Sequence, residues 1–191
     1  MSIKRVLVGV AVAAALATGL TGCARPPAAV AVVDGVVIDA QQITAAVPVL
    51  TTNLSQTTDF AGADFTQVAV DWRIQSIMFT AAAAKQGVTL SDDLRDQFVA
   101  QNYADGSIGQ IMWQDPAARV VFAGFIDNYL LGQMINAGQL DSGQLMDAIG
   151  AVSVKLNPRY GVWDPDQAVV DATNGQPAGM LADPVVFTRP A

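Results

Sequence analysis

The sequence predicts a mainly helical domain that begins with a small β-hairpin. Valine-rich runs at 30–33 and 36–38 flank Asp34 and Gly35, and Asp-Gly between β-branched runs is the strongest short signal for a hairpin turn. Further along, apolar residues recur every three or four positions, which is the period of amphipathic helices. The stretch 152–156 indicates one more strand.

The hairpin is apolar on both faces. Across the turn Val33 faces Val36 and Val32 faces Val37, and successive side chains of a strand point to opposite faces. An isolated hairpin is only marginally stable in water, so helices must cover this one or a third strand must join it. Pairing of consecutive strands alone gives two strands; we hypothesise that 152–156 lies alongside as the third.

Helix boundaries follow from capping residues. Serine or aspartate before a helix can accept the free backbone N–H groups of its first turn. Pro48 lies inside the first helical pattern and is expected to kink or divide it. We expect a first helix from 40 toward 53 and further helices at 65–86, 92–102, 116–136 and 140–149, with Asp39, Asp64, Ser91 and Asp115 as caps of the first four. Loops are expected at 51–62, which overlaps the end of the first helix, at 103–107 and around 111–113.

The first residues have the plan of an export signal. Lys4 and Arg5 precede an apolar or small run at 6–20, which ends in Leu-Thr-Gly before Cys23. This ending resembles the lipobox of bacterial lipoproteins. The resemblance implies that 1–22 are removed, that the Cys23 thiol carries a diacylglycerol, and that the protein is anchored by lipid at the extracytoplasmic face of the cell membrane.

Two other interpretations of this segment stay open: an ordinary cleaved signal with a chance cysteine, and an uncleaved membrane helix. The apolar run is short for a membrane span, and the single cysteine of the chain stands where lipidation requires it. Residues 23–28 then form a tether, which Pro26 and Pro27 hold extended.

The composition excludes several classes of function. The chain has no histidine and no glutamate, and its net charge is −7. Removal of Lys4 and Arg5 with the signal leaves eight basic against seventeen acidic residues, a balance of −9. Such a charge repels phosphate backbones and anionic headgroups, so we expect no nucleic-acid partner and membrane contact through the lipid alone. The commonest general acid–base group and zinc ligand are missing.

Two segments resemble a known family. The stretch 29–38 reads Ala-Val-Ala-Val-Val-Asp-Gly-Val-Val-Ile and is similar to the hairpin that opens the N-terminal domain of SurA/PrsA-type envelope chaperones. The stretch 157–164 reads Asn-Pro-Arg-Tyr-Gly-Val-Trp-Asp and is similar to a segment of actinobacterial lipoproteins in that group. Together they bracket a SurA N-terminal-like helical domain at 29–164, followed by a Pro- and Gly-rich tail at 165–191 that we expect to be poorly ordered.

The resemblance implies a chaperone-like role in which unfolded or extended client polypeptides are bound without catalysis. Many members of the family carry a parvulin-type prolyl isomerase domain, whose site usually includes histidines. This chain has none and leaves no room for that domain, so no catalytic residue is carried over and no cofactor is expected. A structural or assembly subunit of a cell-envelope complex is the alternative; an enzyme ranks behind both.

Four residues are candidates for client contact. Met112 and Trp113 stand in a predicted loop, where exposed side chains often carry function, and Tyr160 with Trp163 can form a recognition patch. The alternatives are ordinary core positions for the first pair and a fixed turn against the core for the second. The acidic residues Asp164, Asp166 and Asp171 do not have the spacing of a calcium loop, so no metal site is predicted.

Overall fold

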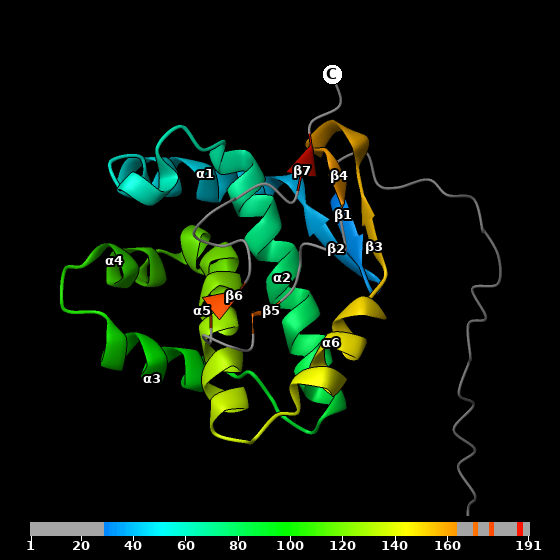
Figure 1. Cartoon of the computed structure of the whole chain (residues 1–191). Coiled ribbons are helices and arrows are strands. Elements are labelled where there is room, and N and C mark those ends of the chain that lie inside the picture. Colours follow the sequence, from blue (N-terminus) through cyan, green and yellow to red (C-terminus); the bar gives the residue numbers. More distant parts are fainter. Residues whose placement is uncertain (1–28, 164–169, 172–175, 178–186, 189–191) are drawn as a thin grey trace, which may run out of the picture.

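The computed structural model describes residues 29–163, 170–171, 176–177 and 187–188, and a small three-stranded antiparallel sheet and six α-helices form most of this part of the chain (Figure 1). This confirms the predicted fold class. The predicted signal segment, Cys23 and the tether lie outside the described residues.

The sheet has the order β2-β1-β3, formed by β1 (Ala29–Val33), β2 (Val36–Asp39) and β3 (Val154–Leu156). Both pairs are antiparallel, and the register places Val32 opposite Val37 and Val33 opposite Val36, as predicted. The hypothesis of a third strand is therefore confirmed, and β1 is the central strand.

The turn between β1 and β2 has the expected geometry. Asp34 and Gly35 both have positive φ, at 47° and 85°, the combination that a tight two-residue hairpin turn requires. Val36 and Val37 remain 45% and 46% exposed, which shows that the end of the hairpin projects beyond the core.

The helices begin after the predicted caps. The carboxylate of Asp39 accepts the backbone N–H of Gln41 at 2.7 Å, and Asp115 accepts those of Ala117 and Ala118 at 2.9 Å each. Asp64 and Ser91 cap in the same way. The helices are α1 (Ala40–Leu54), α2 (Phe65–Lys85), α3 (Asp92–Asn102), α4 (Ile108–Gln114), α5 (Pro116–Asn136) and α6 (Ser142–Gly150), with 3₁₀ turns η1 (Thr58–Phe60) and η2 (Pro158–Tyr160).

Two boundary predictions were wrong. Helix α1 is not divided at Pro48 and continues to Leu54, which is buried in the core, so the predicted loop at 51–62 begins only after Leu54. The predicted loop around 111–113 is helix α4, which starts at a Ser107 cap. Its seven residues are too few to show a clear apolar period.

Helices α2 and α5 form the centre of the molecule (Figure 1). In that view α3 and α4 lie on one side of them, and the sheet and α6 on the other. The two central helices cross closely where Gly124 faces the Trp72 backbone. Trp72 and Phe122 pack beside this crossing with ring centroids 5.7 Å apart.

Short ladders follow the domain. Strand β4 (Val162–Trp163) pairs with β7 (Phe187–Thr188), and β5 (Val170–Asp171) pairs with β6 (Gln176–Pro177). The prediction of a poorly ordered tail at 165–191 otherwise falls on residues outside the described part, as do Asp164 and Asp166.

Candidate binding cleft

A cleft of about 620 Å³ lies between α2, α3, α5 and the hairpin turn. Three arginines line it, Arg73 from α2, Arg95 from α3 and Arg119 from α5, and we call it the arginine cleft. Its volume falls within the range of about 300–1,000 Å³ typical of ligand-binding pockets. Its walls also include the apolar residues Val36, Ile77, Ala81, Leu90, Val120 and Ala123, and the indole of Trp113.

The helical period brings these side chains together. On α2 the lining positions include 73, 77, 80 and 84, and on α5 they include 119, 120 and 123. Positions three or four apart share one face of a helix, so each helix presents a continuous wall. The Asp34–Gly35 turn adds the exposed Val36 at the edge.

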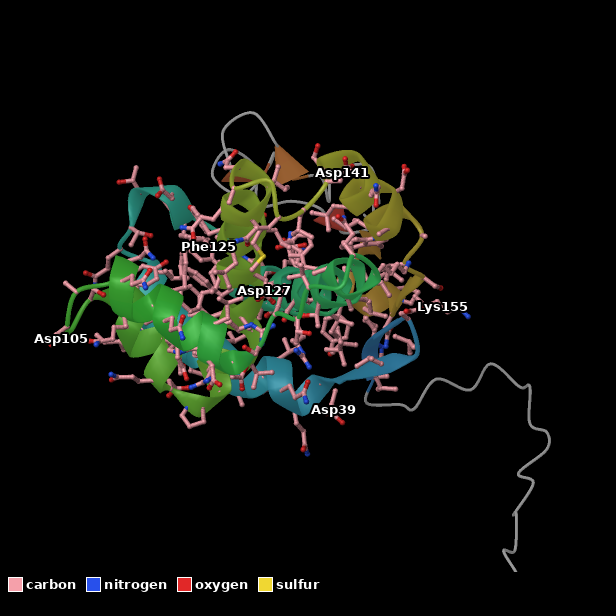
Figure 2. All side chains as sticks on the ribbon, turned by 90° about the horizontal axis from the view of Figure 1, so that it is seen from below. Asp39, Asp105, Phe125, Asp127, Asp141 and Lys155 are labelled. Atoms are coloured by element: carbon pink, nitrogen blue, oxygen red, sulfur yellow. The ribbon has the colours of Figure 1, made fainter. Side chains whose placement is uncertain are left out.

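Arg95, one of the lining residues, forms a buried ion pair with Asp127. Its Nε and Nη2 donate to the two oxygens of Asp127 at 2.7 and 3.0 Å, and Ser76 Oγ donates to Asp127 Oδ2 at 3.0 Å. Asp127 is fully buried, and Figure 2 shows it in the middle of the helical body. Burial raises the pKa of Asp127, although the hydrogen bonds and charge of Arg95 act against this.

Arg95 makes two further hydrogen bonds, to Asp92 and Thr80. Its Nη1 donates to Asp92 Oδ1 at 3.0 Å and its Nη2 to Thr80 Oγ1 at 3.3 Å. Burial alone would lower the pKa of Arg95, but the contacts with Asp127 and Asp92 outweigh it and the pKa is raised. The charge of Arg95 is therefore compensated by two carboxylates, Asp127 and Asp92.

Arg119 is held at the rim. Its Nη2 lies 3.1 Å from Asp96 Oδ1, and its guanidinium carbon lies 4.1 Å from the centroid of the Trp113 ring. Trp113 Nε1 in turn donates to Asp96 Oδ1 at 2.7 Å. This cluster connects α3, α4 and α5, so the indole of Trp113 is fixed in the wall of the cleft.

Arg73 differs from the other two arginines. Its Nε is buried and donates to no acceptor, and no hydrogen bond or ion pair joins the Arg73 side chain to another described residue. Burial, followed by repulsion from Arg95, lowers the pKa of Arg73, with Asp127 acting in the opposite direction. An arginine nevertheless stays charged at neutral pH. The arginine cleft therefore contains a partly desolvated cation without a counter-ion among the described residues.

A second hollow, the aromatic pocket, lies between α1, α2, α4 and α5 and has a volume of about 180 Å³. It is smaller than typical small-molecule pockets. Ile108 lines it and is 37% exposed, and Ile111, also on α4, is 43% exposed. Its lining also includes Leu54, Phe60, Trp72, Tyr103, Met112, Phe122 and Phe125.

The structure does not bring the four predicted contact residues together. Met112 and Trp113 are 2% and 4% exposed, so the prediction that they project from a loop was wrong. As neighbours on a helix they point in different directions: Met112 lines the aromatic pocket and Trp113 the arginine cleft. Tyr160 and Trp163 are half-buried and pack against the core.

The segment around Tyr160 is held in a fixed turn. The Asn157 backbone N–H donates to Val30 O at 2.8 Å, and its side-chain amide donates to Ala29 O at 3.1 Å. The Asn157 side chain also accepts the backbone N–H of Arg159 at 3.2 Å. These bonds attach the turn to β1, which favours the interpretation of Tyr160 and Trp163 as packing residues.

Sequence reasoning missed the arginines of the cleft. The available signal was a charge inside the apolar pattern of a core helix: Arg73 in α2 and Asp127 in α5. Such a charge must find a partner, a ligand or solvent.

Within the described part of the chain, no helix is both long and apolar enough to span a bilayer. Nowhere in these residues do three or more histidine, cysteine, aspartate or glutamate side chains cluster so that they could hold a metal ion. The comparisons with known proteins found no matching family model, no similar curated protein and no similar solved structure.

Proposed function

We propose that this protein is a lipid-anchored, extracytoplasmic binding protein of the SurA/PrsA N-terminal type, which holds unfolded or extended segments of client polypeptides without catalysis. The Leu-Thr-Gly-Cys ending of the signal supports the anchor, with Cys23 as the lipidated residue of the cell-membrane form. The hairpin followed by a helical body supports the family relation.

The observation that carries the proposal is the arginine cleft. It is open to solvent, and apolar side chains make up most of its wall. Burial of apolar surface is non-directional and roughly proportional to area, so such a wall accepts many sequences. A chaperone-like protein needs this tolerance because its clients share exposed apolar residues rather than one sequence.

The aromatic pocket supports the same function as a second contact. Met112 in its lining is flexible and polarisable, as suits a pocket for varied side chains, and Ile108 and Ile111 stand exposed on α4. A side chain of the client can enter this pocket while the main chain runs outside it.

An aggregation assay tests the proposal. The mature chain, 23–191, at an equimolar ratio should slow the light scattering of an unfolded envelope protein. Ala84→Glu places a charge in the arginine cleft and should weaken this effect, whereas Ala45→Glu, on the exposed side of α1, should not. A mature chain that does not slow aggregation contradicts the proposal.

The anchor has its own test. Mass spectrometry of the membrane fraction should find acyl chains on Cys23, and Cys23→Ala should release the protein from the membrane. Crosslinking in the envelope should then capture many polypeptides in small amounts. One stoichiometric partner would instead indicate a subunit of an assembly.

A further inference from the structure

We propose that Arg73 is a carboxylate anchor, so that the arginine cleft prefers polypeptide segments that carry an acidic side chain or a free C-terminus at that point. This inference rests on the proposed function, because it names the chemistry of the segment that the cleft holds.

The charge balance of the cleft carries the inference. Arg95 is paired with Asp127 and Asp92, and Arg119 with Asp96. Arg73 lines the same cleft without a partner among the described residues, and its Nε is shielded from solvent. An unpaired buried donor carries a desolvation cost that a bound acceptor would remove.

A carboxylate matches this site. A guanidinium presents a planar set of donors that pairs with both oxygens of a carboxylate, and such charge-assisted bonds are about twice as strong as neutral ones. The apolar wall of Ile77, Ala81 and Val120 lies in the same cleft. The ligand should therefore have apolar side chains next to one negative charge.

The acidic residues of the cleft favour a peptide over other anions. Asp34 and Asp92 line it as well, and both are exposed. They can accept backbone N–H groups of an extended peptide, which a fatty acid does not have. A phosphate would be doubly charged and would be repelled by both aspartates.

The net negative charge of the protein disfavours acidic ligands, so a preference for them would be specific to the cleft. The mature chain has a balance of −9, so long-range electrostatics disfavour acidic ligands. A preference for a carboxylate must therefore come from a local contact.

The test uses labelled apolar peptides and fluorescence anisotropy with the mature protein. In the first pair, one peptide ends in a free carboxylate and the other is identical but amidated. In the second pair, both peptides are amidated, and one has an internal glutamate where the other has glutamine. The carboxylate-bearing member of either pair should bind roughly tenfold more tightly, the effect expected of a hydrogen bond to a charged group.

Arg73→Gln should abolish this preference while the amidated peptide binds as before. Arg73→Lys should retain part of it, because a lysine keeps the charge but not the planar set of donors. Arg159→Gln removes the same charge from an exposed position outside the cleft and should change nothing. The thermal unfolding midpoint of each variant shows whether it is folded.

The outcomes separate the two proposals. Equal binding of both members of each pair, with aggregation still slowed, overturns the role of Arg73 and leaves the proposed function standing. No peptide binding and no effect on aggregation overturns the proposed function. Displacement of peptide by inorganic phosphate or laurate at lower concentration than by a second carboxylate peptide overturns the assignment to polypeptide.

Discussion

Arg95 on α3 and Asp127 on α5 form a buried ion pair joined by two hydrogen bonds of 2.7 and 3.0 Å. Arg95 lines the arginine cleft, and the pair connects α3 to α5 in the interior, while Arg119 on α5 and Asp96 on α3 connect the same helices nearer the surface. Asp127 has no exposed surface and Arg95 is 8% exposed, so each charge depends on the other for compensation.

Asp127→Ala should therefore destabilise the fold by about 3–5 kcal/mol, because removal of one partner leaves a buried charge without compensation. Denaturant unfolding measures this loss. Asp93→Ala, on the exposed side of α3, should cost less than about 1 kcal/mol. Replacing both partners, with Arg95→Met and Asp127→Leu, should recover most of the stability, because an apolar pair of similar volume often substitutes for a buried ion pair. A single variant no worse than Asp93→Ala would contradict this account.

The buried carboxyl of Asp71 should make the stability of the folded protein depend on pH. Burial raises its pKa from 3.8 to about 8, so between these values the folded protein holds a proton that the unfolded chain releases. Stability therefore falls as pH rises from about 4 to about 8 and is independent of this group outside that window.

Asp71→Asn removes the ionisable group and should stabilise the protein at neutral pH by up to about 4 kcal/mol, at about 1.36 kcal/mol for each unit of pKa difference. The gain should vanish near pH 4, where the wild-type carboxyl is protonated in both states. Thermal unfolding at the two pH values measures the difference. An equal gain at both would show that packing, and not ionisation, is responsible.

Gly124 allows helices α2 and α5 to cross in close contact. A Cβ at this position would overlap the carbonyl oxygen of Trp72 and would lie 2.7 Å from its carbonyl carbon. Because both partners are helix backbone, Gly124→Ala must push the central helices apart, and we expect a loss of about 3 kcal/mol or more. At Gly150, at the end of α6, a Cβ meets nothing within 4 Å. Gly150→Ala should be neutral or slightly stabilising, and equal unfolding free energies for the two variants would contradict the close crossing.

Trp113 should report occupation of the arginine cleft. Its indole lines the cleft and is held by Asp96 and Arg119, so a bound peptide changes its surroundings. We expect peptide addition to shift the intrinsic fluorescence of the wild type, and Trp113→Phe to abolish most of the shift while anisotropy still detects binding. Trp163→Phe, on β4, should keep the response. A shift that survives in Trp113→Phe would place the bound peptide elsewhere.

Local structure was largely predictable because its causes lie within a few residues. Asp34 and Gly35 determine the hairpin turn and with it the register of Val33 on Val36. Asp39 and Asp115 determine where α1 and α5 begin, through bonds to N–H groups two or three residues ahead. Helix α4 was missed because a helix of seven residues has too short an apolar pattern, and the loop assigned to Met112 and Trp113 was wrong for the same reason.

The sequence by itself determined the mainly helical class, the hairpin with its register, the caps and the acidic charge, since each depends on neighbouring residues or on composition. Only the tertiary structure decided which charges are paired. Arg95 meets Asp127 across 32 positions of sequence, and Arg73 lines the cleft without a partner among the described residues. The pairing of a buried charge depends on how whole helices pack, and no local pattern encodes that geometry.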